Sequence, residues 1–220
     1  MQKIIISDEL RKKTSGIQLH CIGCKVSVYA GSESLWKSIE EKSAELGQRY
    51  RMEDIAGIPA IHASRIAYRL CGKDPARYRL SAEALLRRIV RGDGLYRVCN
   101  VVDLLNLVSV TTGYSIGGYD ADKINGAVTF GIGKANEPYQ GIGRGELNIE
   151  NIPVFRDELG AFGTATSDSV RTSVTEATGQ FLMIIIGFGF YDLLQDATEM
   201  AATLLADYAE GSDFEIQIIK

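Results

Sequence analysis

The segment RVCNVVDLLNLVSVTTGYSIGGYDADKING, residues 97–126, carries the features that decide the fold. Apolar side chains recur at helical spacing over residues 101–111, which predicts a helix. The glycine at 126 comes directly before an apolar run to residue 132, which predicts a strand. The segment therefore predicts a helix followed by a strand.

The preceding stretch SAEALLRRIVRG, residues 81–92, predicts a second helix. Glu83 in its first turn and Gly92 at its end are typical start and stop signals. Its leucines and isoleucine recur on one side and are expected to face inward. The arginines are then expected on or near the outer side, at positions Arg87, Arg88 and Arg91.

The rest of the chain alternates between predicted strands and helices without a repeat or a low-complexity linker. Strands are predicted at 17–29, around 146–155, at 181–188 and at 214–219, and helices at 33–50, 60–70 and 192–208. Ser32 is the predicted N-cap of the first of these helices, and Gly72 the stop signal of the second. This is a mixed α/β chain with irregular connections, so a doubly wound sheet is not the first choice.

Length and composition predict one domain spanning residues 1–220. A chain of 220 residues with 45% hydrophobic content can bury one substantial core. The longest apolar stretch, residues 180–191, is too short to cross a bilayer. The N-terminal order, a short apolar run followed by charge, is the reverse of a signal peptide. We therefore expect a cytoplasmic protein with no membrane partner.

Charge is distributed unevenly along the chain. The formal net charge is only −4, which does not predict a general nucleic-acid binder. Residues 49–97, however, hold eleven basic side chains against five acidic ones, and residues 146–220 hold three against thirteen. Such asymmetry suits contact with a polyanion on one face. The alternative, a solvated helical surface with ordinary ion pairs to the acidic third, stays open at this point.

Most familiar catalytic signatures are missing. Cys21 and Cys24 form a lone C-x-x-C without a second ligand pair, which favours apolar filler in a buried strand over a metal site. The two histidines, His20 and His62, cannot build a metal centre or a Ser-His-Asp triad from this sequence. The Gly-Lys at 133–134 lacks the hydroxyl of a P-loop. No metal and no cofactor are expected.

The segment around residues 97–126 resembles the tRNA-editing domain of the phenylalanyl-tRNA synthetase beta subunit. The V-V-D run ending at Asp103 takes the place of the family's first motif, and Leu105 and Asn106 that of its Thr-Asn. Residues 117–120 take the place of its short turn with His-Ala-Phe-Asp, so the resemblance implies a turn there. The stretch SDSVRTSVTEAT, residues 167–178, looks like the family's late pocket loop. The resemblance covers about two thirds of the chain, whereas residues 1–60 carry no recognisable motif.

The resemblance implies a three-layer β/β/α arrangement and an editing pocket for the aminoacylated 3′ end of tRNA. The implied catalytic residues are Asn106 and Asp168. The implied substrate-binding residues are Gly117, Gly118, Arg171 and Thr172, and tRNA contacts are expected at Arg87, Arg88, Arg91 and Arg97. Ester hydrolysis there needs no metal, cofactor or covalent intermediate, because positioning one water and stabilising the oxyanion suffice.

Three departures from the family change the expected specificity. The family's histidine falls on Gly117 and its threonine on Leu105, while its specificity glutamate aligns near Val170 or Arg171. A preference for tyrosine therefore does not transfer, and glycine at 117 and 118 is expected to widen the pocket. The alternative role of Asn106 is to bridge backbone groups of its helix. Asp103 and Asp120 are expected to tie turns to backbone N–H groups.

Two functions compete at this stage. The first is trans-acting editing, in which an aminoacyl-tRNA deacylase hydrolyses the ester of a mischarged tRNA, with a synthetase as a further partner in trans and no DNA. The second is a non-catalytic tRNA-binding or regulatory module that keeps the fold without the family's histidine and glutamate, since fold alone does not fix function.

Overall fold

Two four-stranded sheets form the framework of the computed structural model, which describes residues 1–220. The first sheet has the order β1 (Ile4–Ile6), β4 (Val128–Ile132), β7 (Pro153–Asp157), β8 (Gly160–Thr164), with β1 parallel to β4 and the other pairs antiparallel. The second is antiparallel, in the order β10 (Ser212–Ile219), β2 (Ile17–Lys25), β9 (Gln180–Phe188), β3 (Ser115–Asp120). A small hairpin joins β5 (Gln140–Gly141) to β6 (Gly145–Glu146).

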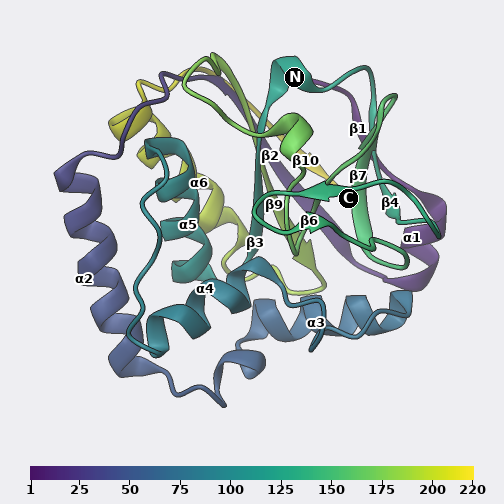
Figure 1. Ribbon diagram of the computed structural model, residues 1–220, viewed down its shortest axis with the longest axis horizontal. Coiled ribbons are helices and arrows are strands. Elements are labelled where there is room, and N and C mark those ends of the chain that lie inside the picture. Colours follow the sequence, from purple (N-terminus) through teal and green to yellow (C-terminus); the bar gives the residue numbers. More distant parts are fainter.

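Helices complete a three-layer arrangement. They are α1 (Asp8–Lys13), α2 (Glu33–Arg49), α3 (Pro59–Cys71), α4 (Ser81–Val90), α5 (Asn100–Thr112) and α6 (Leu194–Ala209), with short 3-10 turns η1 (Ile55–Gly57), η2 (Ala121–Lys123) and η3 (Val170–Thr172). Figure 1 shows α2, α5 and α6 on one side of the sheet that contains β3, and the first sheet on its other side. The mixed α/β class and the β/β/α layering predicted from the resemblance are confirmed.

The sheet in the middle is buried on both faces, which explains the sequence of β9. Its Leu182, Ile184 and Ile186 pack into the core between the two sheets. The intervening Met183 and Ile185 pack against the helices, in a second core. A strand covered on both faces reads as a continuous apolar run instead of an alternating one. None of the helices is long and apolar enough to cross a bilayer.

The predicted helix boundaries agree closely with the structure. The Ser32 side chain accepts the N–H of Leu35 at the start of α2, as its N-cap position predicts. Gly72 ends α3 in the left-handed conformation, with φ of +95°. The predicted helix over residues 101–111 is α5, and the one over 81–92 is α4.

The predicted turn at residues 117–120 is wrong, because these residues form most of strand β3. Their glycines serve packing instead: a Cβ on Gly117 would lie 2.0 Å from the Tyr119 hydroxyl. The prediction also missed β1, α1 and β8. Residues 1–60, which carry no motif, supply β2 to the centre of one sheet and β1 to the edge of the other.

The two cysteines of the C-x-x-C lie on opposite faces of β2. Cys21 packs into the core between the sheets and Cys24 into the core beneath the helices. Burial raises the pKa of Cys21 to about 12 and that of Cys24 to about 11, so both stay protonated thiols. The interpretation of these residues as buried strand filler is confirmed. No group of three or more His, Cys, Asp and Glu side chains that could hold a metal ion is present.

Candidate functional site

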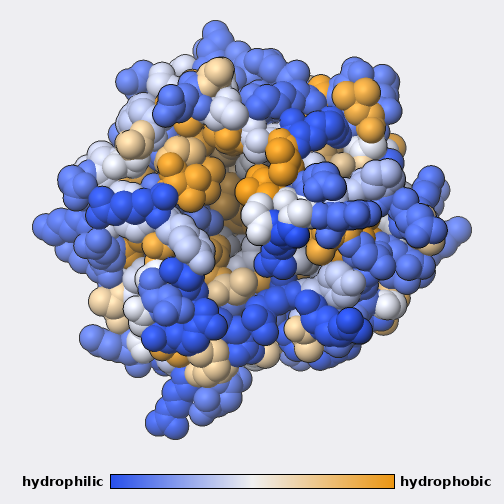
Figure 2. Space-filling view, viewed as in Figure 1, coloured by the Kyte–Doolittle hydropathy of each residue, from blue (hydrophilic) through white to orange (hydrophobic).

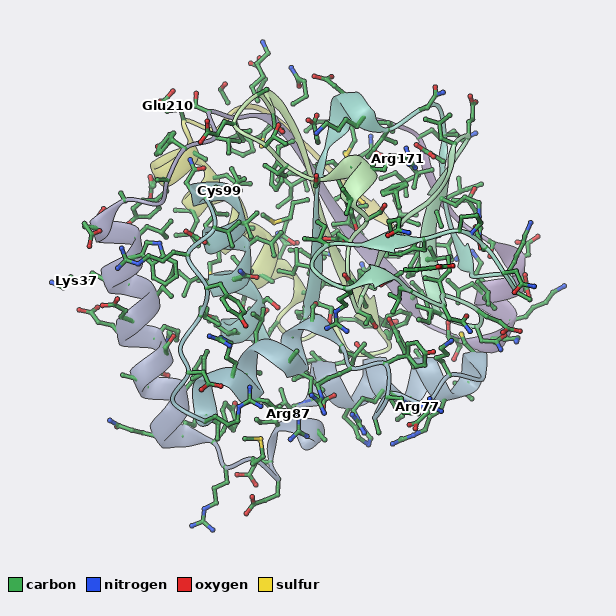
Figure 3. The ribbon with its side chains drawn as sticks, viewed as in Figure 1. Lys37, Arg77, Arg87, Cys99, Arg171 and Glu210 are labelled. Atoms are coloured by element: carbon green, nitrogen blue, oxygen red, sulfur yellow. The ribbon has the colours of Figure 1, made fainter.

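The candidate site lies at the free edge of β3. Strand β3 pairs with β9 on one side only, so its other edge has no strand partner. Figure 2 shows this face of the molecule hollowed beside β3, between α5 and the segment that holds η3, with hydrophobic side chains on the walls. Figure 3 places Cys99, at the start of α5, and Arg171, in η3, on opposite sides of this hollow.

Asp168 closes the edge of β3 from the side of η3. Its Oδ1 accepts the Tyr119 hydroxyl at 2.9 Å, and its Oδ2 lies 3.4 Å from the backbone nitrogen of Gly118. Its own carbonyl accepts the N–H of Ile142 at 2.9 Å, which ties the β5–β6 hairpin to the same spot. Burial raises the pKa of Asp168 to about 7, although the Tyr119 and Gly118 donors pull the pKa downward. A carboxyl with this pKa can exchange a proton near neutral pH.

The two glycines of β3 do not widen a pocket, contrary to the prediction. The space above Gly117 is filled by the Tyr119 ring, whose hydroxyl would lie 2.0 Å from a Cβ at 117. The space above Gly118 is filled from the helix side, since a Cβ at 118 would lie 2.7 Å from Leu105 Cδ1 and 3.1 Å from the Phe181 ring. Both glycines thus allow close packing of large side chains. Gly118 is the one that approaches Asp168.

Asn106 lies one residue beyond Leu105 on α5, on the helix that forms the other wall of the hollow. Its side chain is half-buried, and its amide forms no hydrogen bond within the protein. The alternative role, bridging backbone groups of the helix, is therefore not what the amide does. Its donor and acceptor are both open to a water molecule or a substrate.

The residues of η3 form the frame of this site. The Arg171 guanidinium binds both carboxylate oxygens of Asp157, at 2.8 and 3.0 Å, and also the carbonyls of Lys123 and Gly160. Burial raises the pKa of Asp157, but these bonds and two backbone N–H donors outweigh it and hold the pKa below its usual value. Thr172 is fully buried, and its hydroxyl has no hydrogen-bond partner.

Arg87 is not directed outward as predicted. Its guanidinium binds Glu83 at 3.0 Å and the carbonyl of Met52 at 3.2 Å. Glu83 is buried, with a side chain only 1% exposed, and also receives Arg65 at 2.7 Å. A buried carboxylate requires such partners, and this requirement turns Arg87 inward. Figure 3 shows Arg87 and Arg77 along the lower side of the same face.

Of the other three arginines, Arg91 and Arg97 are exposed and Arg88 is half-buried. Arg88 stacks on the exposed Tyr96, with its guanidinium 3.7 Å from the ring centroid. Arg91 contacts Asp93 at 3.0 Å. Arg97 lies over Trp36 and contacts two exposed glutamates of α2 at 2.9 and 3.4 Å. The ion pairs of Arg91 and Arg97 are exposed, and such pairs contribute about 0–1 kcal/mol, so a stronger anion can displace them.

Sequence reasoning overlooked Tyr119 as a member of the site because it was assigned to a turn. The spacing of Gly117 and Tyr119 could have indicated this role. Residues two positions apart in a strand lie on the same face, so a glycine there leaves room for the aromatic ring. The expected structural roles of Asp103 and Asp120 are confirmed. Asp103 accepts the N–H of Val98 and the Trp36 indole at 2.9 Å, and Asp120 accepts the N–H of Asp122.

Comparison with known proteins identifies the family. Residues 63–210 match the model of the B3/4 domain. The fold is similar to an N-terminal fragment of the phenylalanyl-tRNA synthetase beta-subunit from Pyrococcus horikoshii, with a TM-score of 0.49 and 12% sequence identity over 99% of this chain. This chain covers 50% of the length of that structure's chain. The search of curated proteins found no match.

Proposed function

Because the chain belongs to the B3/4 domain family, we propose that it hydrolyses the ester bond of mischarged aminoacyl-tRNA, acting in trans. The observation that supports this function best is the half-buried Asp168 at the free edge of β3, opposite a helix that carries the uncommitted Asn106 amide. The hollow beside β3, with α5 on its other side, is open to the surface in Figure 2. The substrate would be the aminoacylated 3′ end of tRNA.

The chemistry requires little from the protein, because an aminoacyl ester beside a ribose hydroxyl is already activated. In this proposal the Asn106 amide orients the attacking water or the oxyanion. Asp168, ionised above about pH 7, holds the substrate ammonium group and thereby sets the position of the ester. Neither step needs a metal, a cofactor or a covalent intermediate.

The remaining residues of the site act mainly through shape. Gly118 lets Leu105 and the Phe181 ring pack against β3, and Gly117 gives the Tyr119 ring its place. Arg171 holds η3 against Asp157, so we assign it to the frame of the substrate site. The buried hydroxyl of Thr172 is the polar group of η3 that lacks a partner in the protein.

Deacylation assays on a panel of mischarged tRNAs test the two central residues. Asn106→Ala should slow hydrolysis more than about tenfold, because one preorganised donor contributes a few kcal/mol to the transition state. Asp168→Ala should lower kcat/KM for every mischarged tRNA more than it lowers the maximal rate, because all aminoacyl esters share the ammonium group that Asp168 is proposed to bind. Gln48→Ala, which removes an exposed amide from α2, is the matched control and should retain wild-type rates. Wild-type rates in both Asn106 and Asp168 variants would refute the site assignment.

We also propose that Arg88, Arg91 and Arg97 contact tRNA phosphates, while Arg87 stabilises the same helix through Glu83. Phosphate contacts predict affinity that falls steeply with salt and depends little on tRNA sequence. Glutamate substitutions at both Arg88 and Arg91 should weaken binding at low salt and flatten the salt dependence. A double variant with unchanged binding would refute this interface.

The absence of a histidine at position 117 favours a second candidate, a tRNA-binding module without catalytic activity. The same substrate panel separates the two functions. A wild-type protein that binds tRNA but leaves every mischarged ester intact would establish the module and exclude the deacylase.

A further inference from the structure

The Tyr119 ring occupies a slot between two glycines. A Cβ on Gly117 would lie 2.0 Å from its hydroxyl, and a Cβ on Gly163 would lie 2.1 Å from it. These glycines belong to different sheets, β3 and β8. Phe162 packs edge-on against the ring at 5.0 Å between centroids and 88° between planes. The ring is fully buried, so its hydroxyl is directed to one point.

That point is the Asp168 carboxylate. The Tyr119 hydroxyl donates to Oδ1 at 2.9 Å, whereas the hydrogen bond to Oδ2, from the Gly118 nitrogen, is long at 3.4 Å. Alternate residues of an edge strand point both backbone groups away from the sheet, so the Gly118 carbonyl also faces the free edge. The Asp168 Oδ2 therefore keeps capacity for a further donor at that edge.

The other titratable groups near Asp168 are committed elsewhere. Tyr139, beside the β5–β6 hairpin, donates to the carbonyl of Ser167 at 2.6 Å. Tyr68, on α3, bonds the Thr166 hydroxyl at 3.0 Å. Arg171, in η3, forms its ion pair with Asp157. No Lys, Arg or His lies within ion-pair distance of the Asp168 carboxylate.

We infer that Tyr119 is a positioning residue of the site: held between Gly117 and Gly163, it binds Asp168 Oδ1 and leaves Oδ2 at the β3 edge for the substrate ammonium group. This inference rests on the proposed deacylase function. It assigns Tyr119 no contact with substrate, and its effect is exerted through the carboxylate. Phenylalanine at 119 would keep the shape of the ring and remove only the hydroxyl.

The first measurement follows the carboxylate itself in the free protein. Carbon-13 labelling of aspartate carboxyls permits an NMR titration, with the Asp168 resonance assigned by its loss in Asp168→Asn. Removing a donor to the charged form raises the pKa, so Tyr119→Phe should move the Asp168 midpoint upward by about one pH unit. Tyr139→Phe removes a hydroxyl that binds the neighbouring backbone instead, and its midpoint should match the wild type.

The second measurement is the pH profile of kcat/KM for deacylation of mischarged tRNA, which reports the groups of the free enzyme. The acidic limb of the Tyr119→Phe profile should move upward with the NMR midpoint, and activity lost at neutral pH should return at higher pH. A purely structural role would lower the rate equally at every pH. Site-specific replacement of Tyr119 by 3-fluorotyrosine gives a stronger donor of nearly the same shape, so it should move the Asp168 midpoint downward. This variant also serves if Tyr119→Phe does not fold.

Failure of this inference and failure of the proposed function can be told apart. An unchanged Asp168 midpoint in both Tyr119 variants would overturn the role of Tyr119, whatever the enzyme does. A shifted midpoint in a protein that deacylates no mischarged tRNA would support the hold of Tyr119 on Asp168 and overturn the proposed function.

Discussion

Asp157 and Asp168 flank strand β8 and show two opposite treatments of a carboxylate. Asp157 has a fully buried side chain that meets the Arg171 guanidinium through both oxygens and also accepts two backbone N–H groups. Asp168 meets a tyrosine hydroxyl and one distant backbone nitrogen, with no cation beside it. The pKa of Asp157 is held below its usual value, and burial raises that of Asp168 to about 7.

The comparison shows that the surroundings of Asp157 stabilise the fold, whereas those of Asp168 do so less. The Asp157–Arg171 pair fixes η3 and the turn after β7, and nothing remains free for a ligand. The Asp168 carboxylate is incompletely satisfied, which is unfavourable for folding and useful for binding a cation or exchanging a proton. The two aspartates lie close in sequence, so their surroundings alone create the contrast.

The largest effect is expected from removing the charge of Asp157, the carboxylate whose partners are complete. Asp157→Asn removes the charge that Arg171 requires and leaves a half-buried guanidinium unpaired. Loss of one partner of a buried pair costs about 3–5 kcal/mol, and the 29% exposure of Arg171 places the expected loss near the lower end. Urea unfolding at neutral pH measures it.

The control for this variant is Asp122→Asn, an exposed aspartate in the neighbouring η2. Surface substitutions of this kind change stability by about 0.5 kcal/mol or less. Equal stabilities of the Asp157 and Asp122 variants would show that the bidentate pair contributes no more than an exposed charge.

A smaller effect is expected from the packing beneath Asp168. Gly117→Ala places a methyl group against the Tyr119 hydroxyl, and overpacking of a buried site costs about 1–3 kcal/mol. Gly179→Ala is the matched control, because a Cβ there meets nothing within 4 Å. Thermal or urea unfolding compares the two. If both variants have wild-type stability, Gly117 does not confine the Tyr119 ring.

Much of the fold could be predicted because its signals are local. The caps at Ser32 and Gly72 and the apolar period of α5 depend on neighbouring residues, and these elements formed where predicted. β3 was missed because the resemblance aligns residues 117–120 with a turn of the family. Gly117 makes room for the Tyr119 ring of the same strand. The Tyr119 hydroxyl also packs against Gly163 of the other sheet, a contact that no local pattern reveals.

The candidate site was less predictable for the same reason. Asn106 and Asp168 were named from a resemblance, and their partners come from distant segments of the chain. Arg87 was expected at the surface because helical spacing describes one helix alone, while the buried Glu83 on that helix demands cations. Tyr119 belongs to the site through the hydrogen bond of its hydroxyl to Asp168, which the sequence does not reveal.

The smallest expected effect tests the unsatisfied side of the comparison through pH. A folded-state pKa of about 7 for Asp168 lies above the unfolded value of about 3.9, so between these values the folded chain binds a proton that the unfolded chain does not. This group therefore makes the wild type less stable as pH rises, by up to about 1.4 kcal/mol per pH unit. Asp168→Asn lacks that slope, so its stability relative to wild type should increase by about 1 kcal/mol between about pH 5.5 and pH 6.5.

The Asp157 contribution has the opposite sign. It is present above about pH 3.9 and is lost only as pH falls through its lowered folded pKa, so it is constant across this interval. His20, whose pKa burial lowers, is shared by both proteins and cancels in the difference. Urea unfolding at the two pH values decides the matter, since a stability difference that does not change with pH would mean that Asp168 is solvated in the folded state like an ordinary surface carboxylate.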